Sequence, residues 1–195
     1  MKSKENIKDK KNALLLLSGG VDSAACLEYL TSNSYLVKSL FIDYGQLAVK
    51  QELIAAKKIA KHYESKLKKL EITSSKRYGA GFIMGRNLLL YSIALVEFKY
   101  EYGIIASGIH KGTNYADCKP KFLTKVQETY DIYTEGRVRL LTPFINWVKA
   151  DILQYCEEKE VPINITYSCE IGKEKPCGKC LSCLDLKKYY AGKNN

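Results

Sequence analysis

Residues 13–23 read ALLLLSGGVDS. Five apolar residues end at Ser18, and the glycine pair that follows leads into residues that can begin a helix. A short apolar run bounded by a turn signal is typical of a buried strand. Glycine lets backbone N–H groups approach an anion closely, and the helix that follows turns its positive end toward the same point. The stretch therefore predicts a strand, a glycine corner and a helix N-terminus that together cradle a phosphate.

The remainder of the chain alternates apolar runs with helical periodicity. The runs that predict strands are Ala13–Leu17, Leu36–Ile42, Leu67–Ile72, Ile104–Ala106 and Val138–Leu141. The stretches that predict helices are residues 21–33, 47–63, 87–102, 120–131 and 148–160. This alternation predicts an α/β fold, doubly wound around a mostly parallel five-stranded sheet. Ligands of such sheets bind beyond the carboxyl ends of the strands, so we expect the functional residues in the loops that follow them.

Composition limits the kinds of protein this chain can be. Its 195 residues, 46% hydrophobic and 27% charged, suit one globular domain. We divide it into a flexible N-terminus (1–12), an α/β domain (13–165) and a zinc-binding C-terminal segment (166–190) packed on the same domain. No apolar run is long enough for a membrane span or a signal peptide, so we expect a cytoplasmic protein with no membrane partner. The formal charge of +10 attracts polyanions, but the lysines are scattered, so nucleic acid is not an expected partner.

Four of the seven cysteines crowd into the C-terminal stretch SCEIGKEKPCGKCLSC, and they are Cys169, Cys177, Cys180 and Cys183. In a reducing compartment such a cluster favours a metal site over disulfides. Four thiolates suit tetrahedral Zn²⁺, and a site closed by four protein ligands has a structural role. We therefore expect one structural Zn²⁺ per chain, held in a C-terminal knuckle. An iron–sulfur cluster and free or oxidised thiols are the alternatives.

The glycine corner lacks the Gly-Lys-Ser/Thr of a Walker A loop and the GxGxxG of the dinucleotide-binding fold. Asp22 would repel a phosphate unless a cation lay between them, and Mg²⁺ prefers one or two carboxylates together with phosphate oxygens. The stretch therefore indicates a phosphate bridged by Mg²⁺. The alternative is that Ser18 caps the helix and Asp22 complements the helix dipole.

SGGVDS resembles the SGGxDS pyrophosphate loop of the ATP pyrophosphatases, the PP-loop superfamily, which cleave ATP between the α and β phosphates. The resemblance implies that the loop holds the departing pyrophosphate when a substrate oxygen is adenylated. It also implies a nucleotide site made of Leu17, Ser18, Gly19, Gly20, Val21, Asp22, Ser23, Asp43 and Gly108. Asp22 and Lys149 would be the catalytic residues, and Lys149, in WVKADI, would reach the departing phosphates. The alternative for Lys149 is an exposed residue in the first turn of a helix.

Four further stretches, FIDYGQ, GRN, NYADCKPKF and the cysteine cluster, lie in this order between Leu14 and Leu186. Together they resemble the 7-cyano-7-deazaguanine synthases of queuosine biosynthesis, which are ATP-dependent carbon–nitrogen ligases that release AMP and pyrophosphate. The resemblance implies that 7-carboxy-7-deazaguanine and ammonia become the nitrile through acyl-adenylate and amide intermediates. It also implies Mg²⁺ bound with ATP, and a homodimer.

Three residues are candidates for binding the deazaguanine substrate. The planar fork of Arg86 suits a carboxylate or a phosphate. Asp117 can accept hydrogen bonds from both the N1–H and the exocyclic amine of a guanine-like edge, although an Asx turn is its alternative role. Asn87 follows Arg86, and a helix cap is its alternative role.

The residues that depart from the family pattern lie in stretches expected to bind the substrate and not in the ATP or metal motifs. Leu47 and Ala48 stand where Arg-His is usual, Met84 stands where Pro usually precedes GRN, and residues 111–114 replace an Asp-Tyr-Ser stretch. They leave open a relative that adenylates another deazapurine. The motifs also leave open a tRNA-modifying ATP pyrophosphatase (thiolation or lysidine-type ligation) and a zinc-stabilised nucleotide-binding module without turnover. The tRNA enzyme would bind tRNA with strong salt dependence, and the module would release no pyrophosphate.

Overall fold

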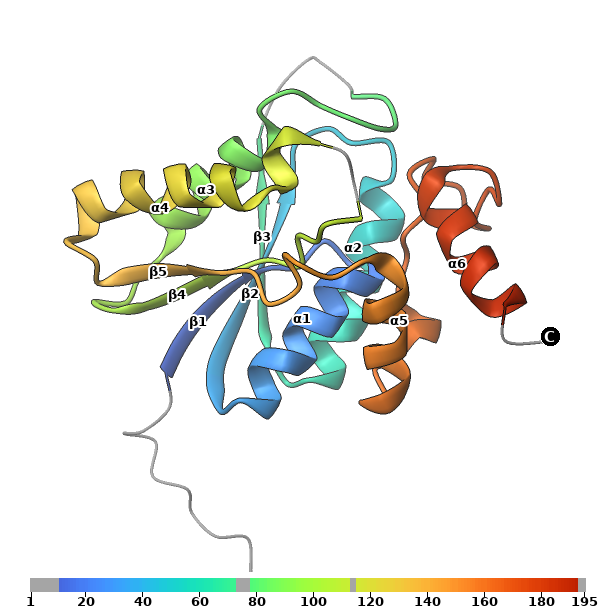
Figure 1. Cartoon of the computed structure of the whole chain (residues 1–195), viewed down its shortest axis with the longest axis horizontal. Helices are drawn as coiled ribbons and strands as arrows, with labels where there is room; N and C mark the ends of the chain where they lie inside the picture. Colours follow the sequence, from blue (N-terminus) through green and yellow to red (C-terminus); the bar gives the residue numbers. More distant parts are fainter. Residues whose placement is uncertain (1–10, 73–77, 113–114, 193–195) are drawn as a thin grey trace, which may run out of the picture.

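The computed structural model describes residues 11–72, 78–112 and 115–192. Their elements are β1 (Lys11–Leu16), α1 (Val21–Ser32), β2 (Tyr35–Asp43), α2 (Val49–His62), β3 (Lys66–Glu71), α3 (Arg86–Glu97), β4 (Gly103–Ala106), η2 (Ala116–Cys118), α4 (Pro120–Thr134), β5 (Val138–Leu141), α5 (Lys149–Glu158), η3 (Ile163–Ile165) and α6 (Leu181–Ala191). The strands form one parallel sheet in the order β3-β2-β1-β4-β5 (Figure 1). The predicted fold class is confirmed.

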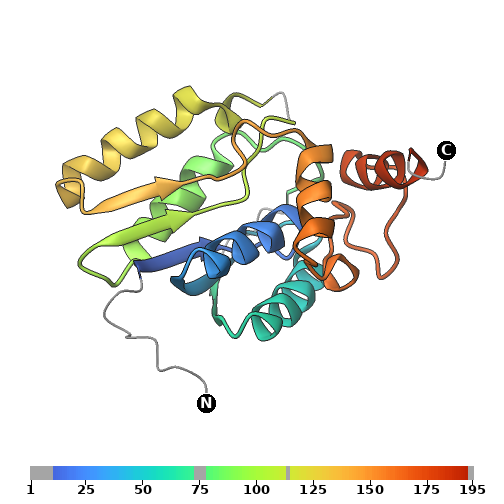
Figure 2. The ribbon, with the colours of Figure 1, turned by 60° about the horizontal axis from the view of Figure 1, so that its bottom comes forward.

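Helices cover both faces of the sheet, because successive residues of a strand point to opposite sides. Ala13 and Leu15 of β1 are fully buried in a core shared with α1, α2 and α5. Leu14, between them, belongs to a second core shared with α3 and α4. Strands buried on both faces need unbroken apolar runs, which is why the central strand reads as a row of leucines. Figures 1 and 2 show the two helical layers on either side of the sheet.

The direction of winding changes between β1 and β4. β2 and β3 lie on one side of β1, and β4 and β5 lie on the other. A crevice opens beyond the carboxyl ends of the strands at such a point, and it is the usual ligand site of doubly wound folds. The glycine corner and the loop after β4 meet here, since a Cβ at Gly108 would come within 2.5 Å of the carbonyl oxygen of Asp22.

The observed elements differ from the predicted ones mainly at their ends. β1 begins at Lys11, so two residues of the predicted flexible N-terminus belong to the sheet; residues 1–10 lie outside the described part. α3 ends at Glu97 and not at residue 102, because Phe98 has extended backbone angles (φ −73°, ψ 111°). α6 was not predicted; it lies beside α5 (Figure 2). None of the described helices is both long and apolar enough to cross a membrane.

Candidate functional site

A cavity of about 320 Å³ lies beyond the carboxyl ends of β1 and β4. Its walls come from the glycine corner, the loop after β4, the first turn of α3 and the C-terminal segment. The predicted site residues that line it are Leu17, Ser18, Gly20, Asp22, Ser23, Arg86, Asn87 and Gly108. One cavity therefore gathers residues predicted for the nucleotide and residues predicted for the substrate. We call its two parts the corner end (around Gly20) and the α3 end (around Arg86).

The glycine corner is held in shape by Gly19 and Ser23. Gly19 has a φ of +90°, and a Cβ there would come within 2.4 Å of the Glu52 carbonyl oxygen, so only glycine fits. The Gly19 N–H donates to Ser23 Oγ (3.2 Å), and that hydroxyl donates to the Gly20 carbonyl (2.9 Å). Gly20 is the N-cap of α1, so the alternative that Ser18 caps the helix is wrong.

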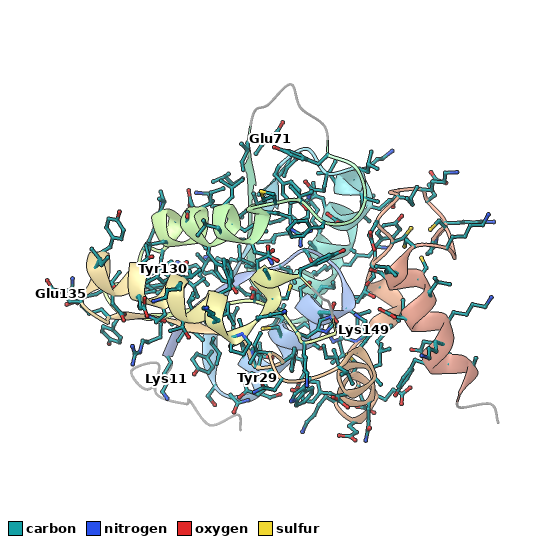
Figure 3. The ribbon with its side chains drawn as sticks, turned by 45° about the horizontal axis from the view of Figure 1, so that its top comes forward. Lys11, Tyr29, Glu71, Tyr130, Glu135 and Lys149 are labelled. Carbon is teal, nitrogen blue, oxygen red and sulfur yellow. The ribbon has the colours of Figure 1, made fainter. Side chains whose placement is uncertain are left out.

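Asp22, in the first turn of α1, faces two basic side chains. Lys149 Nζ donates to Asp22 Oδ1 at 2.5 Å, and the lysine side chain is only 13% exposed. Nε2 of His110 lies 3.8 Å from Asp22 Oδ2. Figure 3 labels Lys149, where α5 begins beside α1. The alternative of an exposed lysine is wrong, and an acid, an ammonium and an imidazole meet at the corner end.

His110 is a residue of the site that sequence reasoning missed. Burial lowers its pKa below the usual 6.5; Asp22 opposes this effect and Lys149 adds to it. The ring accepts the Gly112 N–H at Nδ1 (3.0 Å), so in the neutral imidazole the proton is on Nε2, which faces Asp22. Such a donor can hydrogen-bond a phosphate oxygen. Its place in the loop after β4, two residues beyond Gly108, is the sequence signal that could have found it.

At the α3 end, a short chain of hydrogen bonds ties the start of α3 to the loop after β4. Asn87 is only 6% exposed, and its amide donates to the Asp117 carbonyl oxygen at 3.3 Å. Arg86 Nε donates to Asn87 Oδ1 at 3.3 Å. Gly85, with a φ of +77°, is the N-cap, so the alternative that Asn87 caps the helix is wrong. Burial raises the pKa of Tyr44, another lining residue, and the guanidinium of Arg86 opposes that rise.

Five predicted residues do not line the cavity within the described part of the chain: Gly19, Val21, Asp43, Asp117 and Lys149. Gly19, Val21 and Asp117 are chain neighbours of lining residues, and Lys149 contacts the lining residue Asp22. The Asp43 carboxylate accepts the Gly45 N–H (3.2 Å) and lies 3.4 Å from Lys69 Nζ at the ends of β2 and β3. The departures from the family pattern at residues 113 and 114 lie outside the described residues.

The four cysteines converge on one point. Their sulfur atoms all lie within 4.8 Å of one another, and those of Cys177 and Cys183 are 4.0 Å apart. Tetrahedral Zn²⁺ with Zn–S bonds of about 2.3 Å needs sulfurs about 3.8 Å apart. Burial by itself would raise the pKa of Cys169, but hydrogen bonds from backbone N–H groups, that of Cys177 first, lower it to about 6. This donor set fits a metal ion held by four thiolates.

The C-terminal segment forms a wall of the cavity. Its lining residues are Tyr167, Ser168, Glu170 and Ser182. The Tyr167 N–H donates to the Gly19 carbonyl at 2.9 Å, and Ser168 Oγ accepts the Val21 N–H at 3.2 Å. Sequence reasoning missed these residues, because the contact joins positions 147 apart and no local pattern points to it.

Comparisons with known sequences match nearly the whole chain. The family model described as "Queuosine biosynthesis protein QueC" matches residues 12–80 and 72–193. The chain is 35% identical to a 7-cyano-7-deazaguanine synthase of Prochlorococcus marinus (strain MIT 9515), over 90% of this chain and 91% of that protein. It is 32% identical to the synthase of Picrophilus torridus, over 88% of this chain and 84% of that protein.

Solved structures share the fold at low sequence identity. A 4-thiouridine synthetase, in a complex with RNA and bound ATP, matches with a TM-score of 0.53 and 16% identity, over 93% of this chain and 50% of that chain. The NH3-dependent NAD synthetase of Campylobacter jejuni matches with a TM-score of 0.50 and 16% identity, over 96% of this chain and 80% of that chain. These two likenesses concern the fold alone.

Proposed function

The chain belongs to the family of the queuosine biosynthesis protein QueC, and we propose that it uses ATP to convert 7-carboxy-7-deazaguanine and ammonia to 7-cyano-7-deazaguanine. Family membership carries the nitrile synthase function that the sequence predicted. The observation that supports the ATP-dependent chemistry is the SGGVDS corner, which borders the same cavity as Arg86 and Asn87. A nucleotide and a second substrate can therefore meet in one site.

At the corner end, the proposed task of the chain is to hold pyrophosphate. The glycine N–H groups and the positive end of α1 favour negative charge there. Lys149 contacts Asp22, so it lies within reach of pyrophosphate bound at the corner end. Its ammonium neutralises the charge that develops as the bond between the α and β phosphates breaks. The Nε2–H of His110 is a further donor on the same side.

The reaction uses two adenylations. A carboxylate oxygen of the substrate attacks the α phosphorus of ATP, and pyrophosphate leaves. Ammonia then displaces AMP from the acyl-adenylate and loses a proton, which gives the amide. The amide oxygen attacks the α phosphorus of a second ATP, pyrophosphate and a proton leave, and loss of AMP with another proton leaves the nitrile. The protein contributes orientation and neutralisation of charge.

At the α3 end, the proposed task is to hold the deazaguanine. The Arg86 fork binds the substrate carboxylate through paired hydrogen bonds. Asp117 does not line the cavity itself but lies between the lining residues Tyr115 and Cys118, so its carboxylate would turn toward the cavity to accept from the two donors of the guanine-like edge. Asn87 positions Asp117 by donating to its backbone carbonyl.

Two metal ions fit residues of this chain. Asp22 would hold Mg²⁺, because its carboxylate is 29% exposed and already faces the ammonium of Lys149, so a divalent ion can take that place beside a phosphate. Mg²⁺ supplies Lewis-acid stabilisation of phosphate charge. Cys169, Cys177, Cys180 and Cys183 would hold Zn²⁺, whose closed four-thiolate shell makes it structural.

The test is a reaction of the purified protein with ATP, Mg²⁺, ammonia and 7-carboxy-7-deazaguanine, followed by mass spectrometry. We expect the nitrile only when all four are present. The matched control is 7-deazaguanine without the carboxylate, which should give no product. AMP formation that requires tRNA would instead identify a tRNA-modifying enzyme, and ATP binding without turnover would identify a binding module.

We also propose a cytoplasmic homodimer that does not bind nucleic acid. Exposed apolar side chains on α3, Leu88, Leu89 and Val96, support the dimer, because a second copy would cover them. Sedimentation should give twice the chain mass of 22.1 kDa, unchanged by added tRNA. A particle of single-chain mass, or a complex with tRNA, would contradict this assignment.

A further inference from the structure

Ser168 joins the C-terminal segment to the glycine corner, and the proposed function does not use it. Its hydroxyl accepts the Val21 N–H at 3.2 Å, and the neighbouring Tyr167 N–H donates to the Gly19 carbonyl at 2.9 Å. We propose that Ser168 is a phosphate-binding residue: its hydroxyl holds the first N–H of α1 in the free protein and donates to a phosphate oxygen when pyrophosphate binds. The identity of that anion rests on the proposed function.

The Ser168 hydroxyl lies beside the start of α1, within reach of an anion bound there. Ser168 lines the cavity, and its Oγ is 3.4 Å from the point that a Cβ of Gly20 would occupy. Ser18 Oγ is 3.6 Å from the same point, so two serine hydroxyls surround Gly20. The N–H that Ser168 binds belongs to the first residue of α1, where unpaired N–H groups and the helix dipole attract anions.

The proton of the Ser168 hydroxyl is available to a ligand. A hydroxyl can accept and donate at once, and this one accepts from Val21. The other two corner hydroxyls are engaged as donors: Ser18 Oγ donates to Ser23 Oγ (3.2 Å), and Ser23 Oγ donates to the Gly20 carbonyl (2.9 Å). Within the described residues, no acceptor is paired with the Ser168 hydroxyl. It is therefore the corner hydroxyl best placed to donate to a phosphate oxygen.

The cysteine cluster fixes the position of Ser168. The next residue, Cys169, is 2% exposed, and its sulfur accepts the Cys177 N–H at 3.3 Å. On the other side, the Tyr167 hydroxyl donates to the Lys173 carbonyl at 2.6 Å. These contacts order the hydroxyl before a ligand arrives, so little conformational freedom is lost on binding.

If Ser168 were only a helix cap, removing its hydroxyl would have the opposite effect on the affinity for pyrophosphate. If Ser168 only satisfied the Val21 N–H, its loss would free that N–H for the anion. Pyrophosphate would then bind as well as before or more tightly, while the helix lost the benefit of a cap. The direction of the change in affinity therefore separates the two roles.

The experiment titrates inorganic pyrophosphate with Mg²⁺ into the full-length, metal-loaded protein by calorimetry. The variants are Ser168→Ala, Ser168→Thr, which keeps the hydroxyl, and the control Ser92→Ala. Ser92 lies on the exposed side of α3, and its hydroxyl donates to the Leu88 carbonyl. We expect Ser168→Ala to weaken binding about ten-fold, since a hydrogen bond to a charged group is lost. Ser168→Thr should restore affinity, and Ser92→Ala should leave it unchanged.

Unchanged or tighter binding in Ser168→Ala would overturn the proposal. So would a loss that Ser168→Thr does not restore, because the effect would then come from the position of the segment and not from the hydroxyl. Melting temperature and metal content are measured on each variant, to show that the fold and the cluster are intact. The titration needs no deazaguanine, so a missing nitrile product would count against the proposed function and not against this role of Ser168.

Discussion

At the corner end of the cavity, consecutive residues between β1 and α1 hold one another in place, whereas the α3 end is assembled from stretches far apart in the sequence. Gly19 and Ser23 set the shape of the corner within five residues. The α3 end takes Tyr44 from the loop after β2, Arg86 and Asn87 from α3, and Tyr115 and Cys118 from the loop before α4.

This difference separates what a short motif can specify from what the whole fold must specify. A six-residue motif between a strand and a helix can by itself create a phosphate site, because the backbone of one turn supplies the N–H groups. The recognition of a second substrate depends on how three loops are placed relative to one another. Changes at the two ends should therefore alter different kinetic parameters.

Loss of the metal site should change the protein most. Cys183→Ser removes one of four ligands, and metal binding energy is also folding energy, so we expect the free energy of unfolding to fall by about 3 kcal/mol or more. That corresponds to a decrease in melting temperature of roughly 6–12 °C for a chain of this size. Thermal denaturation with and without a chelator checks it.

The same change also tests the comparison between the two ends. Because Tyr167 and Ser168 bind the glycine corner, the variant should lose affinity for pyrophosphate at temperatures where it is still folded. Equal stability of the variant and the unaltered protein, with and without chelator, would contradict a structural metal.

Lys149→Ala should give the next largest effect. Loss of the ammonium removes charge stabilisation at the departing phosphates, and removing such a group costs roughly 10²–10³-fold in kcat. The KM for the deazaguanine should change little, since Lys149 contacts the corner end. The matched control is Lys159→Ala, an exposed lysine just after α5. A kcat within a factor of two of the unaltered protein would remove Lys149 from the mechanism.

Asp117→Asn should act at the other end. The asparagine amide keeps the size of the side chain but places its N–H group against an N–H group of the substrate. We therefore expect about a ten-fold higher KM for 7-carboxy-7-deazaguanine. The KM for ATP should be unchanged, and Glu128→Gln on the exposed side of α4 is the control. Should the ATP parameters change as much as those of the deazaguanine, the separation of the two ends would be wrong.

His110 should give the smallest effect, seen in the pH dependence of stability. Burial holds its folded pKa below 6.5, so below that pH the unfolded chain binds the proton more readily than the folded protein. The stabilisation is complete above about pH 6.5 and is lost as the pH falls through the folded pKa. His110→Asn should flatten the loss of stability in this range. Identical pH profiles for His110→Asn and the unaltered protein would contradict this account.

The fold could be predicted from the sequence because its main signals are local. The leucines of β1 and the glycines after it gave the central strand and the first turn correctly. α6 was missed, because two of the residues around its start, Cys180 and Cys183, were interpreted as metal ligands and the helical pattern around them is weak. The early end of α3 depends on the backbone angles of Phe98, which no periodicity reveals.

In the site, too, the residues that could be predicted are those with local signals. The residues of the glycine corner and the four cysteines follow from short spacings, and the structure brings each set together. Ser168 could not be identified, because it gains its place only when the chain returns to the corner from a distant segment. His110 was missed although its position two residues beyond Gly108 was a usable signal. The pairing of Lys149 with Asp22 is also a tertiary contact that no local pattern predicts, although the position of Lys149 after β5 placed it in the correct loop.

Every role proposed for the corner end depends on the glycine corner binding the pyrophosphate released when the substrate is adenylated. The most direct measurement follows the phosphorus products by ³¹P NMR during turnover with ATP, ammonia and 7-carboxy-7-deazaguanine. We expect AMP and pyrophosphate in equal amounts, both formed roughly 10²–10³-fold more slowly by Lys149→Ala. Formation of ADP and orthophosphate would contradict it.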